Sequence, residues 1–174
     1  MRTHLTAIIA TVFFLTSTVH VAVADDHDKG YRWVPVSGTA IHYFTTAIIH
    51  SEDSTWNGKT QRSTDSIDLD GDLVGRVLYQ PISKFDFVAG TLVNTGLQVF
   101  SGTVLGSKPV LIYDDEFRFD VNLATGATTG NVFLTERIAG PRIKCELEIV
   151  GTGFTPEGDG LANYSGRCKM RMNK

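Results

Sequence analysis

Hydrophobic and polar residues alternate one by one through much of the second half of the chain. From Phe117 to Leu123 every second residue is apolar, and the residues between are charged or amide side chains. After a turn at 124–130, the pattern returns with Val132, Leu134 and Ile138. A period of two places successive side chains on opposite faces of a strand, so the two segments predict a β-hairpin with one apolar face.

The two cysteines fall on the apolar phase of two further segments of this kind. Residues 143–149 and 164–172 alternate in the same way, with Cys145 in the first and Cys168 in the second. Antiparallel strands joined by the glycine-rich segment 151–160 would bring the two side chains together, so we expect a disulfide. Closing that loop would contribute about 3 kcal/mol. The alternative is a pair of unlinked core cysteines.

The first half of the chain is also typical of strands separated by turns. No segment of 12 or more residues repeats apolar positions at helical spacing. A polar connection over 51–66 contains Asn57-Gly58, a strong turn signal. The strands predicted in this half are Thr39–His50, two within Ile67–Gln80 around the turn 70–72, then 83–89 and 90–105.

About eight successive strands without helices predict an all-β antiparallel barrel, closed or nearly closed, because closure removes exposed sheet edges. A β-sandwich would use the same alternation and is the alternative.

The first 24 residues predict a cleavable secretory signal peptide. Arg2 precedes an apolar run, and Ala22-Val23-Ala24 fits the small-x-small cleavage pattern. A membrane anchor is the alternative, but polar residues interrupt the run well short of the length that a spanning helix needs. We expect residues 25–30 to be a disordered mature N-terminus and 31–174 a single barrel domain, secreted or periplasmic and without a stable membrane span.

Charge and motifs narrow the function classes. The net charge of −3 gives no basic surface for nucleic acid. No glycine-rich phosphate loop precedes a helix, so no cofactor is predicted. The stretch Asp65–Asp72 resembles a calcium loop but lacks the closing carboxylate at Val77, which favours a solvated turn. Neither cysteine has a metal-ligand partner at the usual spacing, so no metal is predicted either.

Glu136 is the candidate general acid or base. It lies on the apolar phase between Leu134 and Ile138, where loss of hydration would raise its pKa toward neutrality. A strand end open to water, or an ion pair with Arg76 or Arg118, is the structural alternative.

Tyr43 and Tyr79 also have apolar neighbours at alternate positions. As inward side chains they would orient a carbonyl from within the barrel, or else serve as core aromatics. His42 and His50 share the opposite phase to Tyr43 and are expected to face solvent. The remaining exposed-phase aromatics are Phe44, Phe100 and Phe133.

Several glycine-centred turns carry a family resemblance. They are Gly75-Arg76-Val77 after an acidic turn, Gly90-Thr91-Leu92, Gly151-Thr152-Gly153 and Gly158-Asp159-Gly160-Leu161. Over about 100 residues this pattern resembles small barrels of the allene oxide cyclase and dirigent group. The resemblance implies a barrel whose mouth holds a hydrophobic small molecule, sometimes for a cyclisation.

Two functions follow from these observations. One is an exported barrel that binds a hydrophobic small molecule and, as an enzyme, would be a cofactor-independent cyclase or isomerase using Glu136, Tyr43 and Tyr79. The other is a non-catalytic exported domain that binds a protein or glycan through an outer patch of Phe44, Phe100 and Phe133. An internal cavity favours the first function and a solid core the second. The oligomeric state is not predicted.

Overall fold

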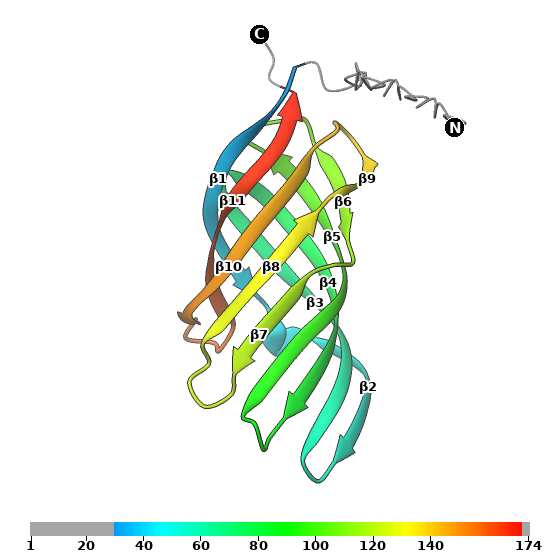
Figure 1. Ribbon diagram of the computed structural model, residues 1–174, viewed down its shortest axis with the longest axis vertical. Helices are drawn as coiled ribbons and strands as arrows, with labels where there is room; N and C mark the ends of the chain where they lie inside the picture. The colour runs from blue at the N-terminus through cyan, green and yellow to red at the C-terminus, as the bar shows by residue number, and fades with distance from the viewer. Residues whose placement is uncertain (1–29, 172–174) are drawn as a thin grey trace, which may run out of the picture.

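The computed structural model describes residues 30–171, which form a closed eight-stranded antiparallel β-barrel with three additional strands (Figure 1). The all-β barrel prediction is therefore confirmed over the sandwich. The predicted signal peptide and residues 25–29 lie outside the described part of the chain. The eight barrel strands are β1 (Tyr31–His42), β3 (Gly58–Gly71), β4 (Leu73–Asp86), β5 (Thr91–Val104), β7 (Arg118–Asn122), β8 (Thr128–Leu134), β10 (Lys144–Phe154) and β11 (Gly160–Arg171).

The barrel closes because β1 pairs with β11 along its whole length and with β3 at its C-terminal end. Two short strands pair with different parts of β5. β7 pairs with the start of β5, and β6 (Val110–Asp114) pairs with a later part. The three additional strands are β2 (Ile48–Thr55), β6 and β9 (Glu136–Ala139). β2 pairs with the first half of β3, and β9 pairs with β6. Closure leaves few unpaired strand edges.

Two predictions for the first half of the chain are wrong. Thr39–His50 is not one strand, because β1 ends at His42 and a single 3-10 turn, η2 (Phe44–Thr46), precedes β2. The polar segment 51–66 is not a connection but most of the β2–β3 hairpin, which turns at Trp56-Asn57, one residue before the predicted Asn57-Gly58. Its polar character reflects two features: β2 is exposed throughout, and β3 directs polar side chains into the barrel.

The predicted alternation of the last strands is confirmed. Ile143, Cys145 and Leu147 are buried, and Lys144 between them is exposed. Cys145 lies directly opposite Cys168 in the register of β10 and β11, and their sulfurs form the predicted disulfide with an S–S distance of 2.01 Å. The phase of two neighbouring strands was therefore sufficient to pair the cysteines.

The half of the barrel that contains the disulfide has a solid interior, which we call the filled half. Large apolar side chains from most strands meet there with almost no exposed surface. Such close packing is the main source of stability in a small domain. Its members are Val36, Leu73, Phe100, Val104, Val110, Ile112, Ile143, Tyr164 and the two cysteines.

The hydroxyl of Tyr164 anchors the β3–β4 turn to the filled half. It accepts a hydrogen bond from the Leu73 amide at 2.8 Å and lies within donating distance of the Asp70 carbonyl, at 3.2 Å. The ring lies over Gly38, where a Cβ would come within 2.3 Å of the hydroxyl. A glycine at this position is therefore required for the tyrosine to reach the turn.

Candidate functional site: a cavity in the open half of the barrel

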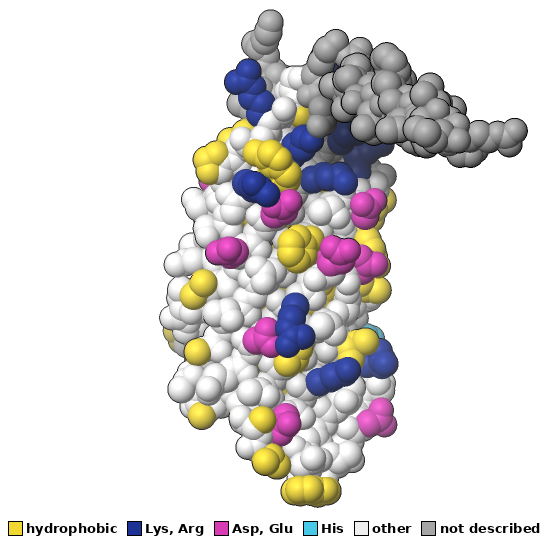
Figure 2. All heavy atoms as spheres, viewed as in Figure 1, with side chains coloured by type: hydrophobic (Ala, Val, Ile, Leu, Met, Phe, Trp, Pro, Cys, Tyr) yellow, Lys and Arg dark blue, Asp and Glu magenta, His cyan; other side chains and the backbone are white. Residues whose placement is uncertain are grey.

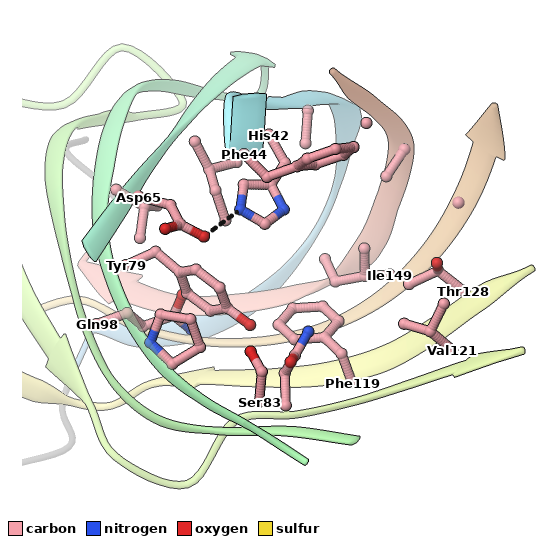
Figure 3. Close-up of a pocket in the computed structure, with 18 of the residues that line it drawn as sticks. His42, Phe44, Asp65, Tyr79, Ser83, Gln98, Phe119, Val121, Thr128 and Ile149 are labelled. Carbon is pink, nitrogen blue, oxygen red and sulfur yellow. Dashed lines mark hydrogen bonds and ion pairs between the residues drawn. The ribbon is translucent and has the colours of Figure 1, made fainter. Parts of the chain in front are cut away.

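The other half of the barrel, which we call the hollow half, encloses a cavity of about 450 Å³ (Figure 3). Leu69, Val77, Leu134 and Leu147 line its inner end, toward the filled half. Small-molecule sites in proteins commonly have volumes of about 300–1,000 Å³. The residues of the hollow half that line it further out include Phe85, Leu92, Phe119, Val121, Thr128, Ile149 and Phe154.

The cavity exists because many inward positions of this half carry small side chains. Ala40, Ser63 and Ser83 occupy positions at which large apolar residues would fill the interior. Phe119 lies against the backbone of Gly130 on β8, where a Cβ would come within 2.2 Å of its ring. The ring therefore packs along the wall and leaves the centre open.

His42 and Asp65 form a polar pair on the cavity wall. The Nε2 atom of His42 lies 3.0 Å from Oδ2 of Asp65, and the Asp65 side chain is 6% exposed (Figure 3). The other carboxylate oxygen, Oδ1, is buried and has no hydrogen-bond partner among the described residues. A buried carboxylate is costly without partners, so the bond from His42 is its principal compensation.

Tyr79 completes this polar group, as its ring packs edge-on against His42 with centroids 5.2 Å apart. Its side chain is buried and lines the cavity, so the inward position predicted for it is confirmed. Burial raises the pKa of Tyr79 well above the usual tyrosine value, and the charge of Asp65 raises it further, whereas a hydrogen bond with the Asn94 side chain partly offsets the rise. The phenol is therefore neutral at physiological pH and available as a donor.

Two neighbouring segments partly cover His42 at the open end. Phe44 of the η2 turn packs edge-on against the His42 ring at 5.5 Å and against Phe154 at 6.2 Å. Asp159, in the β10–β11 connection, accepts hydrogen bonds from the amide and hydroxyl of Thr45. These contacts hold the η2 turn against the mouth of the cavity.

The predicted phase of β1 is wrong. Inward side chains come from the even positions, including Val36 and Ala40, and His42 continues that series into the cavity. Tyr43 instead lies outside, with its ring 6.0 Å from the Arg76 guanidinium. Partial burial and the neighbouring Asp68 raise the pKa of Tyr43 on this outer surface. The apolar neighbours that suggested an inward Tyr43, such as Ile41, are half-buried on the outer face.

The inward position expected for Glu136 is also wrong. β8 ends at Leu134, and Glu136 begins β9, so Thr135 interrupts the alternation. The Glu136 side chain is 72% exposed and lies 4.0 Å from the Lys144 ammonium. Ile138, expected on the same inward face, is exposed as well. The hypothesis that Glu136 acts as an acid or base inside the barrel therefore loses its premise.

The aromatic residues expected on an outer face do not form one patch. Phe100 is completely buried in the filled half, and Phe44 lines the cavity. Phe133 is half-buried, and its amide donates to the Asp114 carboxylate at 3.0 Å. On the face shown in Figure 2, hydrophobic side chains are scattered among charged side chains of both signs. His50, by contrast, is exposed as predicted and contacts Thr64.

The pair missed by the sequence analysis had a readable signal. Ser63, Asp65, Ile67 and Leu69 alternate along β3, and all four line the cavity. The alternation that suggests an inward Glu136 also places Asp65 on an inward phase, but the polar composition of 51–66 favours a connection over a strand. Val36, Gly38 and Ala40 form the corresponding series that leads to His42.

Residues 30–171 contain neither a cluster of metal-ligating side chains nor a candidate transmembrane helix. No group of three or more His, Cys, Asp or Glu side chains is arranged to hold a metal ion. No helix in this range has the length and apolar character required to cross a membrane.

Comparisons of the chain with protein-family models, with curated proteins and with solved structures give no match. The resemblance to the allene oxide cyclase and dirigent group therefore stays a prediction, and the cavity is the main structural indication of function.

Proposed function

We propose that this protein is an exported barrel that binds a hydrophobic small molecule in its hollow half. The observation that carries the proposal is the cavity of about 450 Å³, whose walls are mainly apolar and include a limited set of polar side chains, among them His42, Asp65 and Tyr79. A few placed polar groups in an apolar cavity are typical of ligand sites. Transfer of an apolar ligand from water would contribute about 25 cal/mol for each Å² of surface buried.

Export is supported by the signal-like first 24 residues and by the disulfide. Disulfides persist mainly in oxidising compartments such as the periplasm and the extracellular medium. We therefore assign the binding function to one of these two locations.

The binding function is tested by titrating the protein with N-phenyl-1-naphthylamine, whose fluorescence rises in apolar sites. Ser83→Phe places a ring in the cavity, because Ser83 is buried and lines it. Ser101→Phe is the matched control, because Ser101 is exposed on β5. Saturable binding by the wild type and by Ser101→Phe, with at least a tenfold loss in Ser83→Phe, is expected. Equal binding by all three proteins, or no saturable binding by the wild type, would contradict the proposal.

A cofactor-independent isomerase or cyclase is the second candidate function. The His42–Asp65 pair favours it, because this pair could take the acid–base role that the sequence analysis gave to Glu136. An imidazole oriented by a carboxylate is a common general base. 5-Nitrobenzisoxazole provides a direct probe. A base removes its ring C–H proton as the N–O bond breaks, which yields a coloured cyanophenolate without any co-reactant. Saturable acceleration that His42→Phe abolishes is expected of an enzyme, and equal rates for wild type and His42→Phe would exclude a basic role for His42.

A further inference from the structure

The His42–Asp65 pair defines the chemistry of the ligand more closely than the cavity volume does, and this inference depends on the binding function proposed above. We infer that the ligand is an amphipathic molecule whose polar end donates a hydrogen bond, such as a hydroxyl group, to Nδ1 of His42.

The first step is the position of the imidazole proton. Nε2 of His42 lies 3.0 Å from the Asp65 carboxylate, whose other oxygen is buried without a partner. If Nε2 carried no proton, its lone pair would face the carboxylate and leave both oxygens unsatisfied in a buried site, which is costly. The proton is therefore assigned to Nε2. In the neutral ring, Nδ1 then carries the lone pair and can only accept.

The second step is the direction in which Nδ1 points. His42 lines the cavity with 28% of its side chain exposed, and Nδ1 lies on the side of the ring away from Asp65 (Figure 3). Among the described residues, Nδ1 has no hydrogen-bond partner. The cavity thus presents an acceptor that is fixed in orientation and open to a ligand.

The third step concerns the rest of the ligand. Much of the remaining wall is formed by apolar side chains such as Ile67, Leu69 and Ile149, which offer no hydrogen bonds. An apolar chain or ring system packs against these walls, while a terminal hydroxyl reaches His42. A ligand without a donor would bury the Nδ1 lone pair unsatisfied, and that penalty is the basis of selectivity.

The inference is tested with two isomers that differ only in the polar end, 1-decanol and 1-methoxynonane. Both displace N-phenyl-1-naphthylamine in competition titrations at pH 8, where imidazoles in general are neutral. One net hydrogen bond of about 1 kcal/mol corresponds to an affinity ratio of about five in favour of the alcohol. The expected ratio for the wild type is therefore about three to ten.

Three variants locate the origin of that ratio. His42→Phe removes the acceptor and should invert the preference, because the alcohol then loses its hydration without replacement. Asp65→Asn should reduce the ratio toward one while the probe still binds, since an amide can also donate to Nε2 and so releases the tautomer; this identifies Asp65 as a positioning residue. His50→Phe, at an exposed histidine outside the cavity, is the control and should keep the wild-type ratio.

The outcomes separate the inference from the function on which it depends. Binding of both isomers with equal affinity by the wild type, or an unchanged ratio in His42→Phe, overturns the inference and leaves the binding function intact. Failure of the probe and of both isomers to bind overturns the binding function and the inference together. If His42→Phe does not fold, the wild-type ratio and Asp65→Asn still decide the inference.

Discussion

The filled and hollow halves of the barrel follow the same inward–outward alternation but enclose different interiors. In the filled half the inward positions carry large side chains, such as Leu73, Phe100 and Ile112, and none has measurable exposure. In the hollow half the equivalent positions include Ser63 and Ser83, and the interior is an open cavity. The period of two fixes which side chains point inward, whereas their size and polarity decide whether the interior is solid.

This difference assigns separate roles to the two halves. Close packing and the Cys145–Cys168 bridge concentrate stability in the filled half. The hollow half is less densely packed and leaves space for a ligand. It also contains two buried side-chain oxygens, on Asp65 and Asn94, that lack hydrogen-bond partners among the described residues. Local departures from good packing and full hydrogen bonding are characteristic of functional sites.

The largest expected effect is a difference in the free energy of unfolding between one substitution in each half. Leu73→Ala, at a completely buried position, should lower the free energy of unfolding by about 4 kcal/mol, because it leaves a cavity in a packed core. Leu92→Ala, at a half-buried position on the cavity wall, should cost about 1 kcal/mol, because few contacts are lost. Urea unfolding measures both values. Equal losses would remove the distinction between the halves.

Removal of the disulfide should have the next largest effect. The double substitution of Cys145 and Cys168 by Ala opens a loop with a sequence separation of 23 and should cost about 3 kcal/mol. Binding of N-phenyl-1-naphthylamine below the unfolding transition should stay unchanged, because the bridge belongs to the filled half. A large loss of probe affinity in the folded double variant would show that the halves are coupled.

Tyr164→Phe should have a smaller effect, confined to the anchored turn. The substitution deletes the acceptor of the buried Leu73 amide and should cost about 2 kcal/mol, because that donor is left without a partner. Tyr79→Phe is the matched change in the hollow half and should cost less than half as much. Thermal unfolding of the two variants side by side checks the order, and the reverse order would contradict the comparison.

The smallest expected effect is an alkaline dependence of stability. Burial raises the pKa values of both Tyr79 and Tyr164 above the usual tyrosine value of about 10. The folded state then holds these protons where the unfolded state releases them, so stability falls as the pH rises above about 10. Tyr79→Phe should make this fall less steep. An identical pH profile for wild type and variant, measured by urea unfolding, would argue against a buried neutral Tyr79.

The sequence predicts the architecture well and the site only in part, for identifiable reasons. The alternation around Cys145 and Cys168 was long and uninterrupted, so both the strands and the bridge could be predicted. Tyr79 was placed inward correctly because Val77 shares its phase on a continuous strand. For Glu136 the same reasoning failed, because the break at Thr135 has no signal in the local pattern.

His42 and Asp65 were missed for a different physical reason. A strand that lines a cavity carries polar and small residues on its inward face, so its alternation resembles that of a solvated loop. Only the register of β1 against β3, which pairs His42 with Ile67, brings the histidine close to Asp65. Such pairing depends on closure of the whole barrel and cannot be obtained from either segment alone.

Ligand contacts measured by NMR test the central account most directly. In a complex of the protein with 1-decanol, intermolecular nuclear Overhauser effects from the alkyl chain should reach the methyl groups of Val121 and Ile149, which line the cavity. They should be absent from those of Leu73 and Ile112 in the filled half. Contacts with both sets of methyl groups, or with surface methyl groups alone, would contradict the account of a solid half joined to a ligand-binding half.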